Sequence, residues 1–154
     1  MTNLLSEVTH RLSGKSLVTA ESLTGGGIGS VLTSVPGASL VYKGGIISYV
    51  NEVKAEVLGV PQEILERYGA VSAWTAGYMA SGVRKLLQAD IAVSVTGLAG
   101  PGGDEFGHPV GTVYVGYESA AKSLVKEYHF SGTRDEVRNQ TIKAALSLIL
   151  EQNA

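Results

Sequence analysis

The feature that most constrains the fold is a nearly unbroken apolar run, "DIAVSVT" at residues 90–96, which leads directly into the glycine-rich segment "GLAGPGGDEFGHP". A strand with one face in water alternates apolar and polar residues, whereas a strand covered on both faces is apolar throughout. We therefore predict a central strand here, with structure packed on both of its sides. Sequence patterns predict four further strands, over residues 16–20, 44–50, 110–118 and 123–130.

Helical patterns alternate with these strands along the chain. Periodic apolar residues and their stop signals predict helices over residues 3–13, 25–34, 51–58, 73–87 and 133–152, with a short helix from Pro61. Ser72 is predicted to cap one helix, and Thr133 with Glu136 forms a capping-box pattern in front of another. Alternating elements favour an α/β fold, and the final pair of strands predicts a hairpin. We expect a single α/β domain over residues 1–154, with three α/β/α layers around a mixed sheet.

Composition narrows the class of protein. Hydrophobic residues make up 44% of the chain and charged residues 17%, which is typical of a globular protein. The formal net charge is −2 without a basic block, so we expect no nucleic-acid partner. The absence of cysteine excludes disulfides, cysteine-based zinc sites and a cysteine nucleophile. No run reaches the roughly 18 apolar residues of a membrane span. The N-terminal residues do not resemble a signal peptide, so the cytoplasm is the expected location.

The segment "TAESLTGGGIGS" at residues 19–30 places Ser22 between a strand end and a glycine-rich turn. It fails the dinucleotide fingerprint, because the third glycine position holds Ser30, and it fails the P-loop pattern, because no lysine follows. Two interpretations remain. Ser22 could be a nucleophile beside backbone N–H groups around Gly25, Gly26 and Gly27 that bind a phosphate or an oxyanion. Alternatively, Ser22 and Thr24 could simply cap a tight strand-to-helix turn.

The segment "SYVNEVK" at residues 48–54 contains a possible general base. If Asn51 is the N-cap, Lys54 occupies the third helical position, where the helix dipole disfavours a positive charge. Partial burial would lower the pKa of Lys54 further and suit it to accept a proton. The alternative is an ordinary exposed lysine. Tyr49 could bind a substrate by stacking or hydrogen bonding, or could pack on the sheet.

Two further segments contain candidate ligand contacts. In "SVTGLAGPGG", Thr96 and the following loop with Gly97 and Gly100 come directly after the buried strand, where open α/β sheets bind their ligands. The alternative is a flexible turn. In "FSGTRDEVR", Arg134 and Arg138 could bind a phosphate or carboxylate, or could form surface ion pairs.

The three histidines show no metal-ligand spacing with carboxylates, so no metal site is predicted. Trp74 and the seven tyrosines are expected to serve in packing.

Taken together, "TAESLTGG", "ISYVNEVKAEVLGV", "GAVS", "SVTGLAGPGG", "PVGTVYVG" and "FSGTRDEVR" resemble the C-terminal domain of the CinA family, over about residues 3–151. That domain also occurs as a stand-alone nicotinamide-nucleotide amidase. The resemblance implies an α/β fold and hydrolysis of the carboxamide of nicotinamide mononucleotide, a small-molecule nucleotide substrate, to nicotinate mononucleotide and ammonia. It further implies no metal or cofactor, and a homodimer or higher homo-oligomer.

The resemblance also assigns roles to residues. Ser22 matches the family's nucleophile and Lys54 its base, with Tyr49 beside the substrate. Thr96 falls in the substrate-site loop, and an arginine of "TRDEVR" near the phosphate. Because the chain does not contain the nucleotide-processing domain of longer CinA proteins, we expect it to lack that second activity. The alternative function is a non-catalytic nucleotide-binding or interaction module in a competence or DNA-damage pathway.

Overall fold

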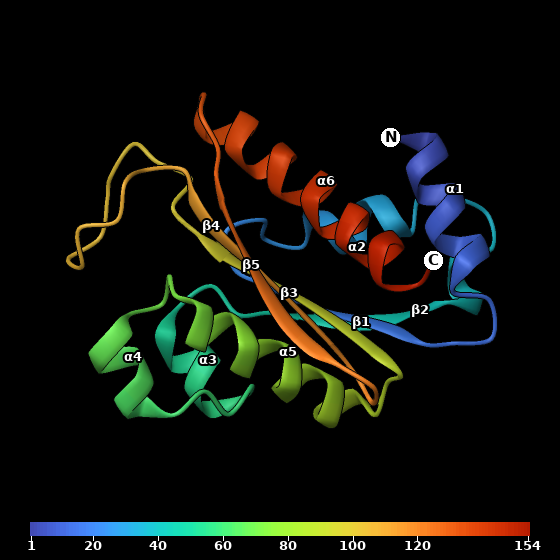
Figure 1. Cartoon of the computed structure of the whole chain (residues 1–154), viewed down its shortest axis with the longest axis horizontal. Helices are drawn as coiled ribbons and strands as arrows, with labels where there is room; N and C mark the ends of the chain where they lie inside the picture. The colour runs from blue at the N-terminus through green and yellow to red at the C-terminus, as the bar shows by residue number, and fades with distance from the viewer.

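A five-stranded mixed sheet forms the centre of the computed structural model, which describes all residues from 1 to 154 (Figure 1). Its strands lie in the order β2-β1-β3-β4-β5. β1 pairs in parallel with β2 and β3, whereas β4 is antiparallel to both β3 and β5. The carboxyl ends of the three parallel strands therefore meet at one edge of the sheet. The strands are β1 (Leu17–Glu21), β2 (Tyr42–Ile47), β3 (Ile91–Gly97), β4 (Thr112–Ser119) and β5 (Ser123–His129).

Helices cover both faces of this sheet, as Figure 1 shows. One face carries α1 (Thr2–Arg11), α2 (Gly27–Leu32) and α6 (Arg134–Gln152), and the other carries α3 (Asn51–Glu56), α4 (Gln62–Tyr68) and α5 (Ala73–Leu87). A short 3-10 helix, η1 (Ala38–Leu40), precedes β2. The predicted three-layer α/β/α fold is confirmed. None of the helices is both long and apolar enough to cross a lipid bilayer.

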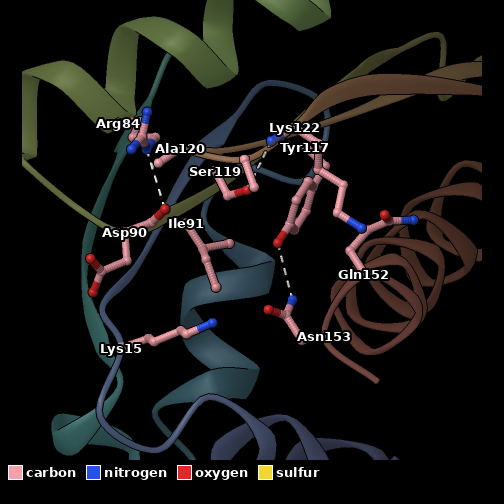
Figure 2. Close-up of a pocket in the computed structure, with 11 residues that line it drawn as sticks. Lys15, Arg84, Asp90, Ile91, Tyr117, Ser119, Ala120, Lys122, Gln152 and Asn153 are labelled. Atoms are coloured by element: carbon pink, nitrogen blue, oxygen red, sulfur yellow. Dashed lines mark hydrogen bonds between the residues drawn. The ribbon is translucent and has the colours of Figure 1, made fainter.

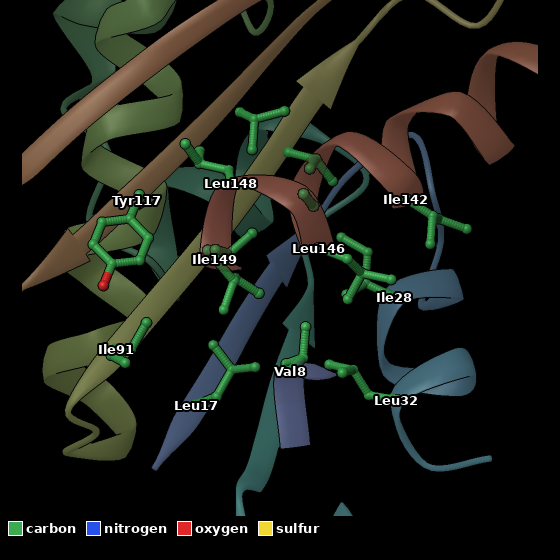
Figure 3. Close-up of a cluster of buried hydrophobic side chains, with 14 of the residues drawn as sticks. Val8, Leu17, Ile28, Leu32, Ile91, Tyr117, Ile142, Leu146, Leu148 and Ile149 are labelled. Carbon is green, nitrogen blue, oxygen red and sulfur yellow. The ribbon is translucent and has the colours of Figure 1, made fainter. Parts of the chain in front are cut away.

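Most of the core lies in two apolar clusters, one on each side of the sheet, and a small third cluster contains Val71, Ala76 and Tyr114. The larger joins the sheet to α1, α2 and α6 and contains Leu17, Ile91 and Leu146 (Figure 3). The second joins the opposite face to α5 and contains Val18 and Ala20. Successive residues of β1 thus enter different clusters, as the pleat of a strand requires. All residues of β3 except its last are buried, which explains its unbroken apolar sequence.

Most of the predicted helix starts are confirmed. The Ser72 side chain accepts a hydrogen bond from the Thr75 N–H and caps α5. Thr133 and Glu136 form the complete capping box of α6. The prediction for Asn51 was wrong, because Val50 is the N-cap and Asn51 is already helical.

The second predicted strand also differs from the structure. β2 covers Tyr42–Ile47, whereas the sequence pattern predicted residues 44–50. The apolar composition continues past Ile47, but residues 48–50 are needed to turn the chain from the sheet into α3. Tyr49 therefore lies in a connection, with 57% of its surface exposed, and is not packed on the sheet.

Candidate active site

The side chains of Ser22 and Lys54 meet at the edge where the parallel strands end. Ser22 directly follows β1, and Lys54 reaches it from α3. The Lys54 Nζ lies 3.0 Å from the Ser22 Oγ. Both residues are buried, with exposed fractions of 7% for Ser22 and 1% for Lys54. A hydroxyl in direct contact with a buried amine is the arrangement of an activated nucleophile and its base.

Two backbone carbonyls complete the surroundings of the Lys54 amine. The Nζ donates to the Ser48 carbonyl at 2.7 Å and to the Tyr49 carbonyl at 3.1 Å. Burial lowers the pKa of Lys54 from 10.5 to about 8, because the charged form loses its hydration. We expected the helix dipole to contribute to the lowered pKa, with Lys54 at the third helical position. Lys54 occupies the fourth position instead, and burial is the cause of the shift.

This pair opens into a cavity of about 300 Å³. Seven of the predicted site residues line it: Ser22, Tyr49, Lys54, Thr96, Gly97, Gly100 and Arg134. Gly25, Gly26 and Arg138 do not line it. The structure thus brings together segments that are far apart in the sequence, as expected at the carboxyl edge of an open α/β sheet.

A second cavity, of about 280 Å³, lies at the other ends of β1 and β3 (Figure 2). Its lining contains three cationic residues, Lys15, Arg84 and Lys122, and one acidic residue, Asp90. The side-chain amines of Lys15 and Lys122 form no hydrogen bond with a hydroxyl there, and the only contact of a lysine nitrogen with a hydroxyl is from the Lys122 backbone N–H to Ser119. We therefore place the candidate active site at the Ser22 cavity.

The glycine-rich turn is organised by Glu21, a buried carboxylate that the sequence analysis missed. Its Oε1 accepts hydrogen bonds from the Thr24 hydroxyl at 2.6 Å and from the Ile28 N–H at 2.8 Å. Its Oε2 accepts from the Gly29 N–H at 3.0 Å. The N-terminal donors of α2 are therefore occupied by the protein's own carboxylate. The available signal was an acidic residue at a strand end, six residues before a helix start.

This arrangement overturns two expectations about the turn. The N–H groups of Gly25 and Gly27 donate to the Ser22 and Thr24 carbonyls, so they are not available to an oxyanion. The Gly26 N–H has no acceptor in the chain, but Gly26 does not line the cavity. Ser22 and Thr24 are not helix caps either, because Gly26 is the N-cap of α2 and the side chain that accepts from the first turn is that of Glu21.

The N–H of Leu23 remains open to a ligand. It donates to no acceptor in the chain, and Leu23 lines the cavity directly after Ser22.

The two candidate arginines have different surroundings. Arg134 lines the cavity, and its guanidinium donates to the Gly100 carbonyl at 2.6 Å and to the Tyr49 hydroxyl at 3.1 Å. Arg138 instead donates to the Leu23 carbonyl at 3.0 Å and to the Thr24 carbonyl at 3.3 Å. Arg138 therefore braces the turn that follows Ser22, and Arg134 is the arginine that lines the cavity.

The end of β3 forms the floor of the cavity. The Thr96 hydroxyl donates to the Ala70 carbonyl at 2.7 Å, which ties β3 to the connection before α5. Gly97 is required by space, since a Cβ there would lie 2.7 Å from a methyl carbon of Val113. The N–H groups of Ala99 and Gly100 have no acceptor in the chain and are available to a ligand.

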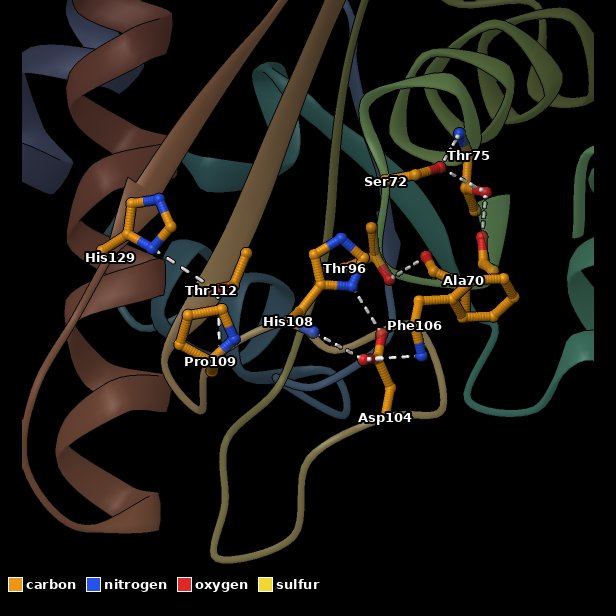
Figure 4. Close-up of polar contacts among 11 residues, drawn as sticks. Ala70, Ser72, Thr75, Thr96, Asp104, Phe106, His108, Pro109, Thr112 and His129 are labelled. Atoms are coloured by element: carbon orange, nitrogen blue, oxygen red, sulfur yellow. Dashed lines mark hydrogen bonds and ion pairs between the residues drawn. The ribbon is translucent and has the colours of Figure 1, made fainter. Parts of the chain in front are cut away.

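Asp104 is the second acidic residue that the sequence analysis missed. It lines the cavity and is hydrogen-bonded to His108 within the same loop (Figure 4). A lone aspartate within a glycine-rich loop has no periodicity or motif to distinguish it. The structure contains no group of three or more His, Cys, Asp or Glu side chains arranged to hold a metal ion.

Comparison with known proteins places this geometry in context. The family model described as the CinA C-terminal domain matches residues 2–153. A CinA-like protein of Thermosynechococcus vestitus is 48% identical over 141 residues, which are 90% of this chain but 34% of that protein. The chain thus spans about a third of the length of the curated relatives it matches.

Solved structures agree with the fold over nearly the whole chain. The competence damage-inducible protein A (ComA) of Klebsiella pneumoniae superposes with a TM-score of 0.95 at 35% identity, covering 97% of this chain and 94% of that one. The competence/damage inducible protein CihA of Agrobacterium tumefaciens also gives a TM-score of 0.95, at 36% identity, with 99% and 94% covered.

Proposed function

The chain belongs to the CinA C-terminal domain family, and from this premise we propose that it hydrolyses the carboxamide of nicotinamide mononucleotide. The products would be nicotinate mononucleotide and ammonia. The observation that carries the proposal is the 3.0 Å contact between the buried Lys54 Nζ and the Ser22 Oγ inside a cavity. The cavity also offers Arg134 for a phosphate group.

The first step is attack by Ser22 on the carboxamide carbon. A neutral lysine amine has two N–H donors and one lone pair, and Lys54 contacts two carbonyls and one hydroxyl. With the donors directed to the Ser48 and Tyr49 carbonyls, the lone pair faces Ser22. Lys54 then accepts the Ser22 proton as the Oγ–carbon bond forms.

The tetrahedral intermediate carries a negative charge on the former carboxamide oxygen. The N–H of Leu23 is the donor best placed for it, because it follows the nucleophile and is unpaired. The Lys54 ammonium then gives its proton to the leaving nitrogen, and the carbon–nitrogen bond breaks to release ammonia. Water, deprotonated by the neutral Lys54, hydrolyses the ester on Ser22 and regenerates the enzyme.

Arg134 is the proposed phosphate contact. A guanidinium has five N–H donors, and its bonds to Gly100 and Tyr49 use two of them. The unpaired N–H groups of Ala99 and Gly100 can add to the same anion site. Tyr49 would act by orienting Arg134, since its hydroxyl contacts Arg134 and its own carbonyl contacts Lys54.

A panel of amides tests the proposed substrate. We expect ammonia release from nicotinamide mononucleotide, and much slower release from nicotinamide, which lacks ribose and phosphate. Ser22→Ala serves as the blank for contaminating amidases. Lys143→Ala is the matched control for the removal of a lysine, because Lys143 is exposed on α6 and should retain full turnover. Release from other amides alone would assign a different substrate.

A second candidate function is a non-catalytic nucleotide-binding or interaction module. The names of the similar structures, which refer to competence and damage, favour it. It predicts that folded protein binds the nucleotide without releasing ammonia and tolerates substitution of Lys54.

A further inference from the structure

Asp104 is the only carboxylate that lines the candidate active-site cavity, where it faces the same space as Lys54 and Arg134. It belongs to the loop of residues 98–111 between β3 and β4. The mechanism proposed above does not use it. A negative charge beside a phosphate site would repel the ligand unless it binds a different part of that ligand.

Hydrogen bonds within the loop fix the Asp104 carboxylate. Its Oδ1 accepts from the Phe106 N–H at 3.2 Å and from the His108 N–H at 3.0 Å. Its Oδ2 contacts the His108 Nδ1 at 2.6 Å. Figure 4 shows these contacts. The His108 ring also packs edge-on against Tyr114 of β4, with 6.5 Å between ring centroids. The loop therefore presents Asp104 in one orientation.

Packing of Phe106 holds the same loop against the other wall of the cavity. Gly69 ends α4, and a Cβ there would lie 2.5 Å from the Phe106 ring. The next residues, Ala70 and Val71, also line the cavity. Asp104 is thus part of a wall that the protein's own contacts hold in place.

The protonation state of Asp104 limits what it can bind. Burial alone would raise its pKa, but the hydrogen bonds and charge of His108 outweigh burial, so the pKa lies below its usual value. The ionised carboxylate can only accept hydrogen bonds, and it has about four acceptor positions. Three are used by Phe106 and His108. The remaining position, on Oδ2, suits one donor from a ligand.

We propose that Asp104 is a specificity-determining residue that accepts a hydrogen bond from a ribose hydroxyl, so that the cavity selects a ribosylated amide. This inference rests on the proposed function. Ser22 and Lys54 would engage the amide and Arg134 the phosphate, and the sugar connects the two. A neutral polyol is the part of such a ligand that an anionic acceptor binds without repulsion. His108 is the positioning residue for Asp104.

The experiment measures binding by calorimetry in an inactive Ser22→Ala background. The ligands are nicotinamide mononucleotide and its 2′-deoxy and 3′-deoxy analogues. We expect Asp104→Asn to weaken binding of the ribonucleotide at least about tenfold, because a hydrogen bond to a charged group is lost. For one of the two deoxy analogues, which lacks the contacted hydroxyl, Asp104→Asn should change the dissociation constant less than about twofold.

Two further variants keep the test specific. Glu105→Gln removes the same charge from the neighbouring exposed position, which does not line the cavity, and should leave binding unchanged. His108→Phe retains a ring against Tyr114 but removes the Nδ1 contact. This variant should weaken binding of the ribonucleotide less than Asp104→Asn does. It should likewise have little effect on binding of the analogue that lacks the contacted hydroxyl.

If Asp104→Asn weakened the binding of all three ligands equally, the proposal would be overturned. Asp104 would then act by attracting the positive charge of the pyridinium ring, or by a structural role. Unchanged binding, or no binding of any ligand, would overturn it as well. Failure of the proposed function gives a different result. In that case the wild-type protein releases no ammonia, while the Ser22→Ala protein still binds the ribonucleotide in an Asp104-dependent manner.

Discussion

At the scale of single residues, the proposed catalysis depends on the charge state of Lys54. The amine is buried against two carbonyls and one hydroxyl, and no carboxylate forms an ion pair with it. No negative charge offsets the effect of burial on the ammonium form, and the pKa of Lys54 therefore falls to about 8. The resulting amine can be neutral near physiological pH, as a general base must be.

The pH dependence of turnover follows directly. Lys54 acts as a base only when neutral, so kcat/KM should rise as pH increases through about 8 and level off above it. At pH 7 only about a tenth of the enzyme would hold a neutral Lys54. A rate profile from pH 6 to pH 10 checks this. A profile that is flat across this range would contradict the role of Lys54.

The same shift predicts a change in stability. Because the folded pKa of about 8 lies below the unfolded 10.5, the charged amine destabilises the fold fully below pH 8, and this cost disappears towards pH 10.5. The free energy of unfolding of the wild type, relative to Lys54→Met, should therefore rise by about 3 kcal/mol across this window. Urea unfolding of both proteins at pH 7.5, 8.5 and 9.5 follows the rise, and a constant difference would refute it.

The two arginines should separate in kinetics. Arg134→Ala removes a cavity cation and should raise KM for the nucleotide at least about tenfold. Arg138→Ala removes the brace from the turn after Ser22, so it should lower kcat and stability and affect KM less. Steady-state kinetics of both variants provide the comparison. A rise in KM for Arg138→Ala and a loss of kcat and stability for Arg134→Ala would contradict these two roles.

At the scale of elements, the strand-to-helix turn between β1 and α2 decides where Ser22 lies. Glu21 is 2% exposed and accepts hydrogen bonds from the Thr24 hydroxyl and from the N–H groups of Ile28 and Gly29 in the first turn of α2. The Glu21 carboxylate therefore fixes the turn by tying it to the start of α2, on the face of the sheet that carries this helix. The carboxylate also satisfies a helix start that would otherwise attract an anion.

Glu21→Gln should disturb this turn while keeping its size. The glutamine amide nitrogen cannot accept from the Gly29 N–H, so we expect a loss of about 1–3 kcal/mol in the free energy of unfolding. Turnover should fall as well, because Ser22 adjoins the disturbed residue. Glu7→Gln, in an exposed pair with Arg11, is the control and should change neither quantity appreciably. Unchanged stability of Glu21→Gln would rule out the capping role.

Elements were the most predictable part of the molecule. The apolar run of β3 and the capping box of Thr133 depend on neighbouring residues, so the sequence alone indicates them. The end of β2 was mispredicted because its apolar pattern continues into a connection whose course is determined by α3. The position of Lys54 beside Ser22 was expected from the family resemblance. From the spacing alone, Lys54 could also have been an ordinary exposed lysine.

Two missed residues, Glu21 and Asp104, and the undecided choice between Arg134 and Arg138 have one physical reason in common. Glu21 caps a helix that begins six residues later, and Asp104 acts through a loop without periodicity. Arg134 and Arg138 lie one turn apart on α6, and only the packing of that helix determines which one enters the cavity. Such roles depend on tertiary contacts, which local patterns do not contain.

At the scale of the whole molecule, the site and the core share the same elements. α6 contributes Arg134 to the cavity at its start and packs Leu146, Leu148 and Ile149 into the larger apolar cluster further along. α6 therefore connects the cavity to the core, with about three turns of helix between Arg134 and Leu146.

Leu146→Ala should separate stability from activity. Leu146 is fully buried, so its truncation should cost about 2–5 kcal/mol in the free energy of unfolding. We expect a clearly lower Tm but a KM for the nucleotide within about threefold of the wild-type value where the variant remains folded. Thermal unfolding and kinetics at low temperature measure both quantities. A large rise in KM would indicate that the core and the cavity are coupled.

The central claim is that Ser22 and Lys54 act as one catalytic pair. The most direct measurement is ammonia release from nicotinamide mononucleotide by the wild type, Ser22→Ala and Lys54→Ala, each shown to be folded by circular dichroism. The account predicts release by the wild type and a loss of at least about a thousandfold in both variants. Normal release by either folded variant would contradict the claim, and no release by the folded wild type would contradict the proposed activity itself.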